Sequence, residues 1–514
     1  MATRELLRRC GQQLGPVLRI PTRCASTVEN VETDQVEARP FRDIPGPRGM
    51  YRWPIIGSIL LFKPFSKHTT ETTQTMLNEM FDQYGPIFQI VMGTKMIVTS
   101  DPKDFKTVFN NEGKYPYRPG IKLIDLYFTR NNLKKDVSML QGEEWHALRA
   151  PVNRRLLKAD SATHYLEPQN AVADDFVKNL ESRDLEAIEL SNLLFRYAGE
   201  SIGVVTFNQR LGFLNDDMNE ESKVFLDAAM ISSKAIIKSF TGESIAHSLY
   251  RNSAYREYEA AHTTLRRISG MYTKRAKEIM NKQKEEGTLN AEEPNLLLSL
   301  ASEETLSEDD VSNIVLTLYT AGSESTAKNI ESFFYNLASN PEKQEILRKE
   351  ILDIVGPDGP LTKQALAQMS YLKACVKESF RINFPTIGGT IRALPVDVIL
   401  SGYRVPAGTL IWMFNPRPAR LYFDDPDKYI PERWLRTTAA RQQETSRNLI
   451  VLPFGHGLRN CMGRRFAVQE MYLAATKVLQ KMKMELDEDS RNTKFQYKLI
   501  IEPVKPLRFK LTKL

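Results

Sequence analysis

The sequence predicts a mainly α-helical fold with a small β region, and three observations lead to that prediction. A helix signal runs from about residue 305 to residue 340, which is long enough to cross a whole domain. Residues 160–300 read as a series of amphipathic helices, for example 255–284. By contrast, β-branched runs on both sides of Gly93 predict a hairpin over 88–98.

The composition is that of an ordinary globular protein. Of the 514 residues, 42% are hydrophobic and 26% are charged. The formal net charge of +7 fits an acidic partner or an anionic membrane surface. Nucleic acid is not expected as a partner, because the basic residues form no dense run among aromatic residues. The chain has 4 cysteines, two of them before residue 25, which gives no disulfide framework and implies a reducing compartment.

The first 27 residues differ from the rest of the chain. They contain the acid Glu5 and a set of arginines, Arg4, Arg8, Arg9, Arg19 and Arg23. This is the composition of a mitochondrial transit peptide, and a disordered basic tail is the alternative. The stretch 53–62 comes nearest to a membrane span, but it is far shorter than the ~20 apolar residues that a spanning helix needs. We therefore expect a transit peptide at 1–27 and a folded region at 28–514.

Two pairs of residues have helical spacing. Trp145 and Arg149 are four residues apart and would share one face of a helix, where a simple packing pair is the alternative to a shared ligand. Glu378 and Arg381 are three apart and can pair, which is commonplace on a helix surface. A second arginine, Arg433, lies further along in a Pro-Glu-Arg-Trp element.

The middle of the long predicted helix is unusual. Residues 321–326 read Ala-Gly-Ser-Glu-Ser-Thr, a polar patch of weak helix formers inside an apolar pattern. Glu324, Ser325 and Thr326 place an acid beside two hydroxyl groups. A local kink caused by glycine and serine is the alternative to a functional role.

One cysteine, Cys461, lies in a glycine-rich stretch, 454–463, that reads Phe-Gly-His-Gly-Leu-Arg-Asn-Cys-Met-Gly. A helix is expected from about Phe466 onward. A thiolate at this place would face backbone N–H groups and a helix N-terminus, both of which stabilise negative charge on sulfur. The alternative is a buried free cysteine in a turn.

The pattern F-x-x-G-x-R-x-C-x-G resembles the haem-binding signature of the cytochromes P-450. The elements around Trp145, Glu324, Glu378 and Arg433 resemble further motifs of that family, and the resemblance extends from about residue 44 to 511. It implies a single large P-450 fold in which haem lies between the long central helix and the cysteine loop. It also implies that the chain is a monooxygenase that uses O2.

The resemblance implies a role for each candidate residue. The thiolate of Cys461 would bind the iron of haem b. Other haem contacts would come from Phe454, Arg459, Trp145, Arg149 and Arg392, of which Trp145, Arg149 and Arg392 would meet the propionates. Protons would reach O2 through Glu324, Ser325 and Thr326, with Ser325 standing where the family usually has threonine. A buried structural triad would consist of Glu378, Arg381 and Arg433.

Two details resemble the mitochondrial class of the family. Lys373 and Lys377 lie four apart before Glu378, and Arg464 and Arg465 follow the cysteine motif. In that class such cations dock an acidic [2Fe-2S] ferredoxin, which receives electrons from NADPH through a ferredoxin reductase. The alternative is that these side chains are merely solvated. The chain has no G-x-G-x-x-G fingerprint, so the reductase is expected to be a separate protein.

The resemblance therefore implies a matrix-side enzyme of the inner mitochondrial membrane that hydroxylates a lipophilic substrate: a steroid, a sterol-like compound or a xenobiotic. A peripheral membrane contact through residues 53–65 is expected. Two other functions stay open on the sequence alone. One is a P-450-type isomerase or lyase that rearranges peroxides without a redox partner, and the other is a haem-binding protein without turnover.

Overall fold

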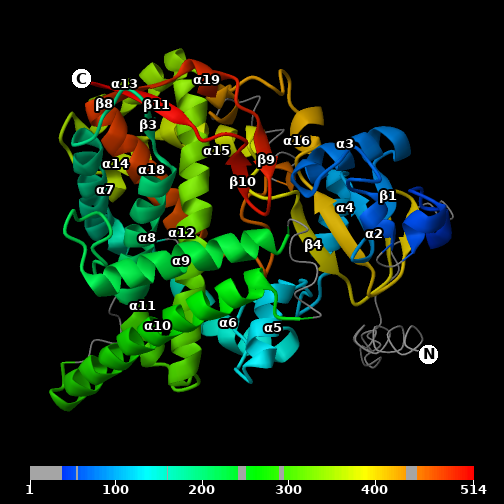
Figure 1. Ribbon diagram of the computed structural model, residues 1–514, viewed down its shortest axis with the longest axis horizontal. Helices are drawn as coiled ribbons and strands as arrows, with labels where there is room; N and C mark the ends of the chain where they lie inside the picture. Colours follow the sequence, from blue (N-terminus) through cyan, green and yellow to red (C-terminus); the bar gives the residue numbers. More distant parts are fainter. Residues whose placement is uncertain (1–37, 54–55, 159, 241–249, 289–294, 436–448) are drawn as a thin grey trace.

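The structure, a computed structural model, describes residues 38–53, 56–158, 160–240, 250–288, 295–435 and 449–514 (Figure 1). The expected transit peptide at 1–27 lies outside this part of the chain. The helices are α2 (Ile56–Leu60), α3 (Thr73–Tyr84), α4 (Pro102–Asn110), α5 (Lys122–Arg130), α6 (Gly142–Leu156), α7 (Leu166–Glu181), α8 (Ser191–Phe207), α9 (Glu220–Lys238), α10 (Ser253–Glu285), α11 (Leu296–Ala301), α12 (Glu308–Ala338), α13 (Pro341–Val355), α14 (Lys363–Gln368), α15 (Ser370–Ile382), α16 (Pro418–Leu421), α18 (Arg464–Lys481) and α19 (Glu488–Arg491).

In the described part of the chain the strands form four small sheets. They are β1 (Ile87–Met92), β2 (Thr94–Thr99), β3 (Ile188–Glu189), β4 (Gly389–Ala393), β5 (Val398–Leu400), β6 (Tyr403–Val405), β7 (Leu410–Phe414), β8 (Met482–Leu486), β9 (Phe495–Tyr497), β10 (Ile501–Pro503) and β11 (Arg508–Lys513). The largest sheet has the order β1-β2-β7-β4. The predicted hairpin at Gly93 is confirmed as β1 and β2, which pair antiparallel with Ile87 opposite Thr99. The mainly α fold with a small β region is confirmed.

The long central helix is α12, and its start follows from local chemistry. The Ser307 hydroxyl accepts from the Asp310 N–H, and the Asp310 carboxylate accepts from the Ser307 N–H, which makes a capping box. Acidic residues in the first turn interact favourably with the positive end of the helix dipole and stabilise the start of the helix. The helix ends at Ala338, just before Pro341 begins α13.

Helix α12 runs through the middle of the molecule, with α9 and α10 crossing it and the sheet with β1 and β4 to one side (Figure 1). It packs against α8, α10, α18 and β10. The main hydrophobic core surrounds α12 and includes Ile314, Ile330 and Phe333, which are fully buried. Among the described residues, no helix is both long enough and apolar enough to cross a membrane.

Candidate active site

The cysteine loop is held in shape by its own backbone. The Cys461 N–H donates to the Phe454 carbonyl over 2.9 Å, and the Asn460 N–H donates to the Gly457 carbonyl over 3.2 Å. Gly457 has φ +73°, and a Cβ there would lie 2.7 Å from a carboxylate oxygen of Glu112, so this position requires glycine. The helix expected after the loop is α18, which starts at Arg464.

Cys461 is exposed as a residue, yet its thiol group has the surroundings of a buried group. Burial raises the pKa of the thiol, while the Gly463 N–H and the charges of Arg149 and Arg118 lower it in part. The backbone N–H group and the cations that the sequence led us to expect are present, but the pKa stays above its ordinary value. Cys461 would therefore need a metal cation as a partner to stay a thiolate at neutral pH.

Trp145 and Arg149 both lie on α6, are buried, and contact the cysteine loop. Arg149 donates to the backbone carbonyl of Asn460, the residue before Cys461. The guanidinium of Arg459 lies 3.8 Å from the centre of the Trp145 ring, a cation–π contact. Arg459 also donates to the carbonyls of Pro116 and Leu140.

Arg392 lies on β4 and is buried. Its Nε donates to a carboxylate oxygen of Glu112 over 2.7 Å, so one edge of this guanidinium already has an anionic partner. Burial raises the pKa of Glu112, and the charge of Arg392 opposes that rise. The sequence did not point to Glu112 because it belongs to no motif that we recognised.

The four arginines Arg118, Arg149, Arg392 and Arg459 act on one another electrostatically, and we call them the arginine cluster. Burial and then the charges of Arg118, Arg392 and Arg149 lower the pKa of Arg459 to about 9. Within the described residues, Glu112 is the carboxylate that pairs with the cluster, so the cluster keeps an excess of positive charge. Arg118 was also missed from the sequence, because a lone arginine in a loop carries no signal of its own.

The middle of α12 has an accessible side. Ala321 is exposed and Glu324 and Ser325 are partly exposed, whereas Ser323 and Thr326 are buried at 1% and 3% exposure. The Ser325 hydroxyl donates to the Ala321 carbonyl over 2.6 Å. The two predicted hydroxyl groups therefore differ in position, since Ser325 shares the accessible side with Glu324 and Thr326 faces the core. Burial raises the pKa of Glu324, and the charge of Lys328 opposes that rise.

Glu378 is fully buried on α15 and accepts hydrogen bonds from five donors, one of which is the backbone N–H of Ile430 over 3.0 Å. Arg381 binds both of its oxygens, at 2.9 and 2.8 Å, and the Arg433 Nε donates over 3.0 Å. The indole N–H of Trp434 donates over 2.8 Å. The structure thus brings Glu378, Arg381 and Arg433 together in one buried ion-pair network.

The four cations expected to dock a redox partner differ in exposure. Lys377 and Arg464 are exposed, and the ammonium of Lys377 lies 5.8 Å from the centre of the Trp434 ring. Lys373 is partly exposed and donates to the Ala367 carbonyl over 3.2 Å. Arg465 turns toward the main chain and donates to the Leu157 carbonyl over 3.2 Å.

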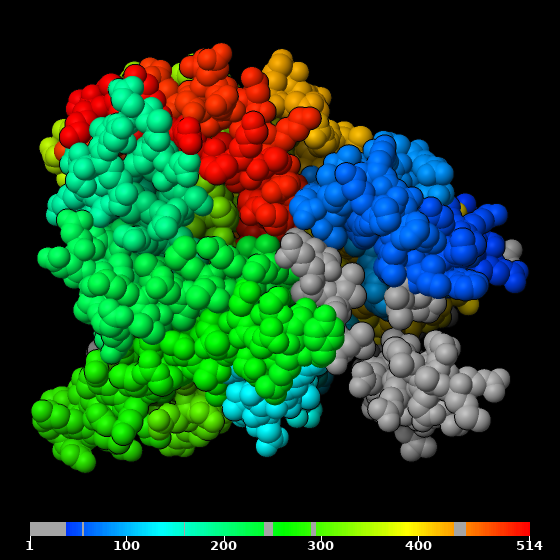
Figure 2. Space-filling model, in the orientation of Figure 1, coloured from blue at the N-terminus to red at the C-terminus, as the bar shows by residue number. Residues whose placement is uncertain are grey.

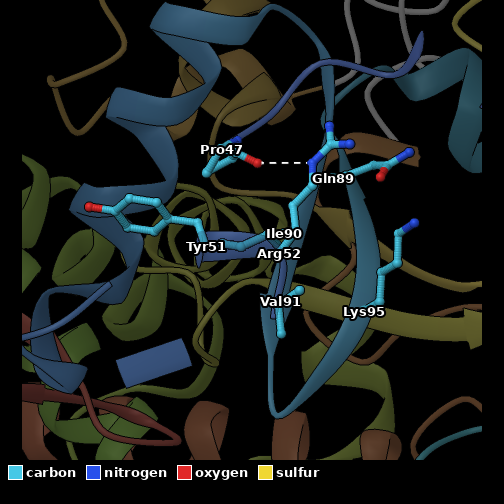
Figure 3. Close-up of a pocket in the computed structure, with 7 residues that line it drawn as sticks. All are labelled: Pro47, Tyr51, Arg52, Gln89, Ile90, Val91 and Lys95. Atoms are coloured by element: carbon cyan, nitrogen blue, oxygen red, sulfur yellow. Dashed lines mark hydrogen bonds between the residues drawn. The ribbon is translucent and has the colours of Figure 1, made fainter. Parts of the chain in front are cut away.

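A small surface pocket of about 50 Å³ lies elsewhere, against β1 and the 3-10 helix Gly49–Arg52 (Figure 3). Its lining residues are Pro47, Tyr51, Arg52, Gln89, Ile90, Val91 and Lys95, none of which is a predicted site residue. It holds little more than one or two water molecules, so it is not a substrate site.

The arrangement of the cysteine loop fits a haem. It offers the cysteine sulfur as one ligand beside a cluster of guanidinium groups with an excess of positive charge, which suits a cofactor with a metal at its centre and carboxylates at its edge. An added Cβ at Gly463 would meet nothing within 4 Å, so no protein contact explains that glycine. Among the described residues, no group of three His, Cys, Asp or Glu side chains could hold a metal ion directly.

The sequence profile of the family "Cytochrome P450" matches residues 47–511. The chain is 28% identical to "Probable cytochrome P450 12a5, mitochondrial" of Drosophila melanogaster, over 94% of this chain and 92% of that protein. It is 29% identical to "Cytochrome P450 10" of Lymnaea stagnalis, over 88% of this chain and 82% of that protein. It is also 29% identical to "Cholesterol side-chain cleavage enzyme, mitochondrial" of Capra hircus, over 91% and 89%.

The chain belongs to the cytochrome P450 family. It is therefore a monooxygenase that uses O2 and a haem with cysteine-thiolate ligation.

Proposed function

We propose that this chain is a mitochondrial P450 that hydroxylates a lipophilic substrate with electrons from a [2Fe-2S] ferredoxin. The observation that carries the proposal is the exposed pair Lys377 and Arg464. Lys377 lies on α15, which contacts the cysteine loop through Phe380 and Phe454, and Arg464 begins α18, directly after the loop. An acidic ferredoxin would be attracted to such a surface at a distance and would leave it readily. The mitochondrial relatives support the same assignment.

The arginine cluster and Trp145 would hold the haem propionates, and Cys461 would hold the iron. Bound haem supplies the iron at which O2 is reduced, and the thiolate donates electron density that favours cleavage of the O–O bond. Phe454, in the cysteine loop, would pack beside the haem. Its ring contacts Phe380 of α15, with centroids 5.4 Å apart, which holds the ring in place.

On the α12 side of the haem, opposite Cys461, Glu324 would pass protons toward O2. The accessible hydroxyl of Ser325 would direct these protons. Thr326 would instead support the packing of α12, since its side chain is buried. The network of Glu378, Arg381 and Arg433 would hold α15 against the segment before the cysteine loop, and thus fix the proximal surface.

The N-terminal segment supports a peripheral contact with the inner membrane. Large apolar side chains are exposed close together there: Met50, Tyr51, Trp53, Ile56, Ile59 and Phe65. Aromatic groups beside basic ones, such as Arg52 and Lys95 at the pocket in Figure 3, suit the headgroup region of a bilayer. Replacing Trp53 and Phe65 with aspartate should release the protein from cardiolipin-containing vesicles in a sedimentation assay, and undiminished binding would refute the contact.

Residues 1–27 would direct import and be removed, which leaves a catalytic domain from residue 28 on the matrix side. The substrate class, a steroid, sterol-like compound or xenobiotic, follows the family and its relatives.

The test uses the protein that starts at Glu29. It is reduced with NADPH, ferredoxin reductase and a mitochondrial ferredoxin under carbon monoxide while the Soret band is recorded. A strongly red-shifted band that forms only with ferredoxin supports the proposal. A band that forms with dithionite alone, but never with ferredoxin, would overturn the choice of electron donor.

The Lys377→Glu variant sharpens this test. The rate of ferredoxin-driven reduction should fall about tenfold at low salt, and the difference should shrink as salt screens the surface. Lys223→Glu, an exposed lysine on α9, is the matched control and should reduce at the normal rate.

A further inference from the structure

Two charged side chains follow Glu324 along the same side of α12, and the proposed mechanism does not use them. Lys328 comes one turn after Glu324, and Glu331 comes three residues later. Their side chains are only 17% and 2% exposed, and the Lys328 ammonium lies 3.1 Å from a Glu331 oxygen. Lys328 also donates to the hydroxyl of Ser191, at the start of α8, over 2.7 Å.

Burying such a pair gives little or no stability compared with apolar side chains of the same size. The pair is therefore not explained by the packing of α12. The pair lies one helical turn beyond Glu324, the acid that would pass protons to O2, and this position suggests a role in proton delivery.

A third acid, Glu502, lies on the strand that packs against this part of the molecule. Strand β10 packs against α12 and carries Glu502, whose carboxylate lies 2.7 Å from the Lys498 ammonium. Gln496 donates to the same oxygen over 2.9 Å. The side chains of Lys498 and Glu502 are 34% and 19% exposed, so this end of the group meets solvent. In Figure 2 the red segment that includes β9 and β10 reaches the surface between the blue N-terminal part and the green helices.

The charges of these groups are coupled. Burial raises the pKa values of Glu324 and Glu331, Lys328 lowers both, and Glu502 raises both. Other elements add Ser233 of α9, whose side chain lowers the pKa of Glu324, and Glu189 of β3, which raises the pKa of Glu331. Carboxyl groups whose pKa values are raised toward neutrality exchange protons most effectively near neutral pH.

We propose that Glu502, Glu331 and Lys328 form a proton path along β10 and α12 that supplies Glu324 from solvent while O2 is reduced. The inference rests on the proposed function. One turnover consumes the substrate C–H group, O2, two electrons from ferredoxin and two protons, and yields the C–OH group and one water. Each proton that leaves Glu324 toward the Ser325 side is replaced from Glu331, and Glu502 takes its replacement from water. Lys328 keeps its own proton, because Glu331 and Glu324 outweigh the effect of burial and raise its pKa, and its ammonium holds the acids in place. These three residues act through Glu324 and are positioning residues.

The decisive variant is Lys328→Met with Glu331→Leu, which removes both charges without leaving one of them unpaired. The matched control is Lys477→Met with Asp174→Leu, which removes a 2.8 Å ion pair between α18 and α7 that includes a buried lysine. Both holoproteins are first reduced by ferredoxin under carbon monoxide. Equal rates and red-shifted bands establish that folding, haem binding and electron delivery are intact.

Oxygen consumption is then measured with NADPH, reductase and ferredoxin, without added substrate, in H2O and in D2O and across pH. The path predicts a rate at least about tenfold lower in the α12 variant, with a larger solvent isotope effect, and no change in the control. A normal rate with a normal isotope effect would overturn the path. A purely structural pair would change stability but not the isotope effect.

Two measurements keep the test decisive. If the double variant does not fold, Glu502→Gln takes its place, because that side chain is partly exposed. The rate of oxygen consumption in this variant should fall about two- to threefold, with a raised solvent isotope effect. An unchanged rate and isotope effect would overturn the path. Infrared titration of the ferric holoprotein, which needs no turnover, should show the protonated-carboxyl band of Glu324 titrating at lower pH in Glu502→Gln. An unmoved band would mean that the surface acid is not coupled to Glu324. This result stands even if ferredoxin proves to be the wrong donor.

Discussion

The guanidinium of Arg459 lies over the indole ring of Trp145, 3.8 Å from its centre, and joins the cysteine loop to α6. The contact gives Arg459 a cation–π partner inside a cluster of like charges. We expect Arg459→Leu to lose haem, because it removes a donor for the cofactor and a support for the loop. The haem-to-protein ratio after purification should fall at least about twofold, by analogy with the loss of other groups that orient a metal site. Arg420→Leu, an exposed arginine on α16, is the control; full haem occupancy in Arg459→Leu would contradict the role.

The two cysteines among the described residues give a matched pair of variants. Cys461→Ser should abolish the red-shifted carbon monoxide band and all turnover, because serine is a poor ligand for haem iron. Cys375 is fully buried on α15, and burial raises its pKa far above the ordinary value, so it has the properties of a small core residue. Cys375→Ala should keep the band and lose only about 1 kcal/mol of stability. A normal spectrum in Cys461→Ser would remove this residue as the ligand.

Glu378 provides the test of the buried ion-pair network. Glu378→Gln leaves the charges of Arg381 and Arg433 buried without a carboxylate, which costs about 3–5 kcal/mol of unfolding free energy. We expect little folded holoprotein, measured by urea unfolding and by the yield of the carbon monoxide band. Glu345→Gln breaks a 3.8 Å pair with Arg348 on the surface of α13 and should change stability by less than about 0.5 kcal/mol. Equal stability of the two variants would show that the network is not structural.

The lowered pKa of Asp310, at the start of α12, predicts that stability depends on pH. Burial pushes its pKa up, but Lys134 and the Ser307 hydroxyl outweigh that effect, so the folded-state pKa lies below the ordinary value. A lowered pKa in the folded state means that the stabilisation is complete above the unfolded value, about 3.9, and is lost as the pH falls toward the folded value. Asp310→Asn should therefore be less stable by about 1 kcal/mol at pH 7, and the difference should shrink below about pH 4. Urea midpoints at several pH values measure this, and a difference that grows in acid would contradict it.

The sequence allowed the long helix to be predicted nearly to its ends, because Ser307, Asp310 and Pro341 are local signals that act within a few residues. The β-hairpin at Gly93 was predictable for the same reason. The arginine cluster was only partly predictable, since Arg118 and Glu112 reach it from a loop more than 270 residues before Arg392. The difference between Ser325 and Thr326 also needed the structure, because a helix motif gives spacing but not which side meets the core. Lys328 and Glu331 looked like ordinary helix residues until their burial was known.

The parallel pairing of β2 with β7 has a consequence for synthesis. Met96 lies opposite Leu410, so this ladder closes a loop of about 310 residues, and the hairpin β1–β2 has no partner on that side until β7 has emerged. Contacts of such high sequence separation form slowly, because the entropy of closing the loop must be spent first. During that interval the Thr94–Thr99 edge is open to pairing with other chains. The newly made polypeptide should therefore depend on a chaperone until its last third has been completed, and it should aggregate when truncated before residue 410.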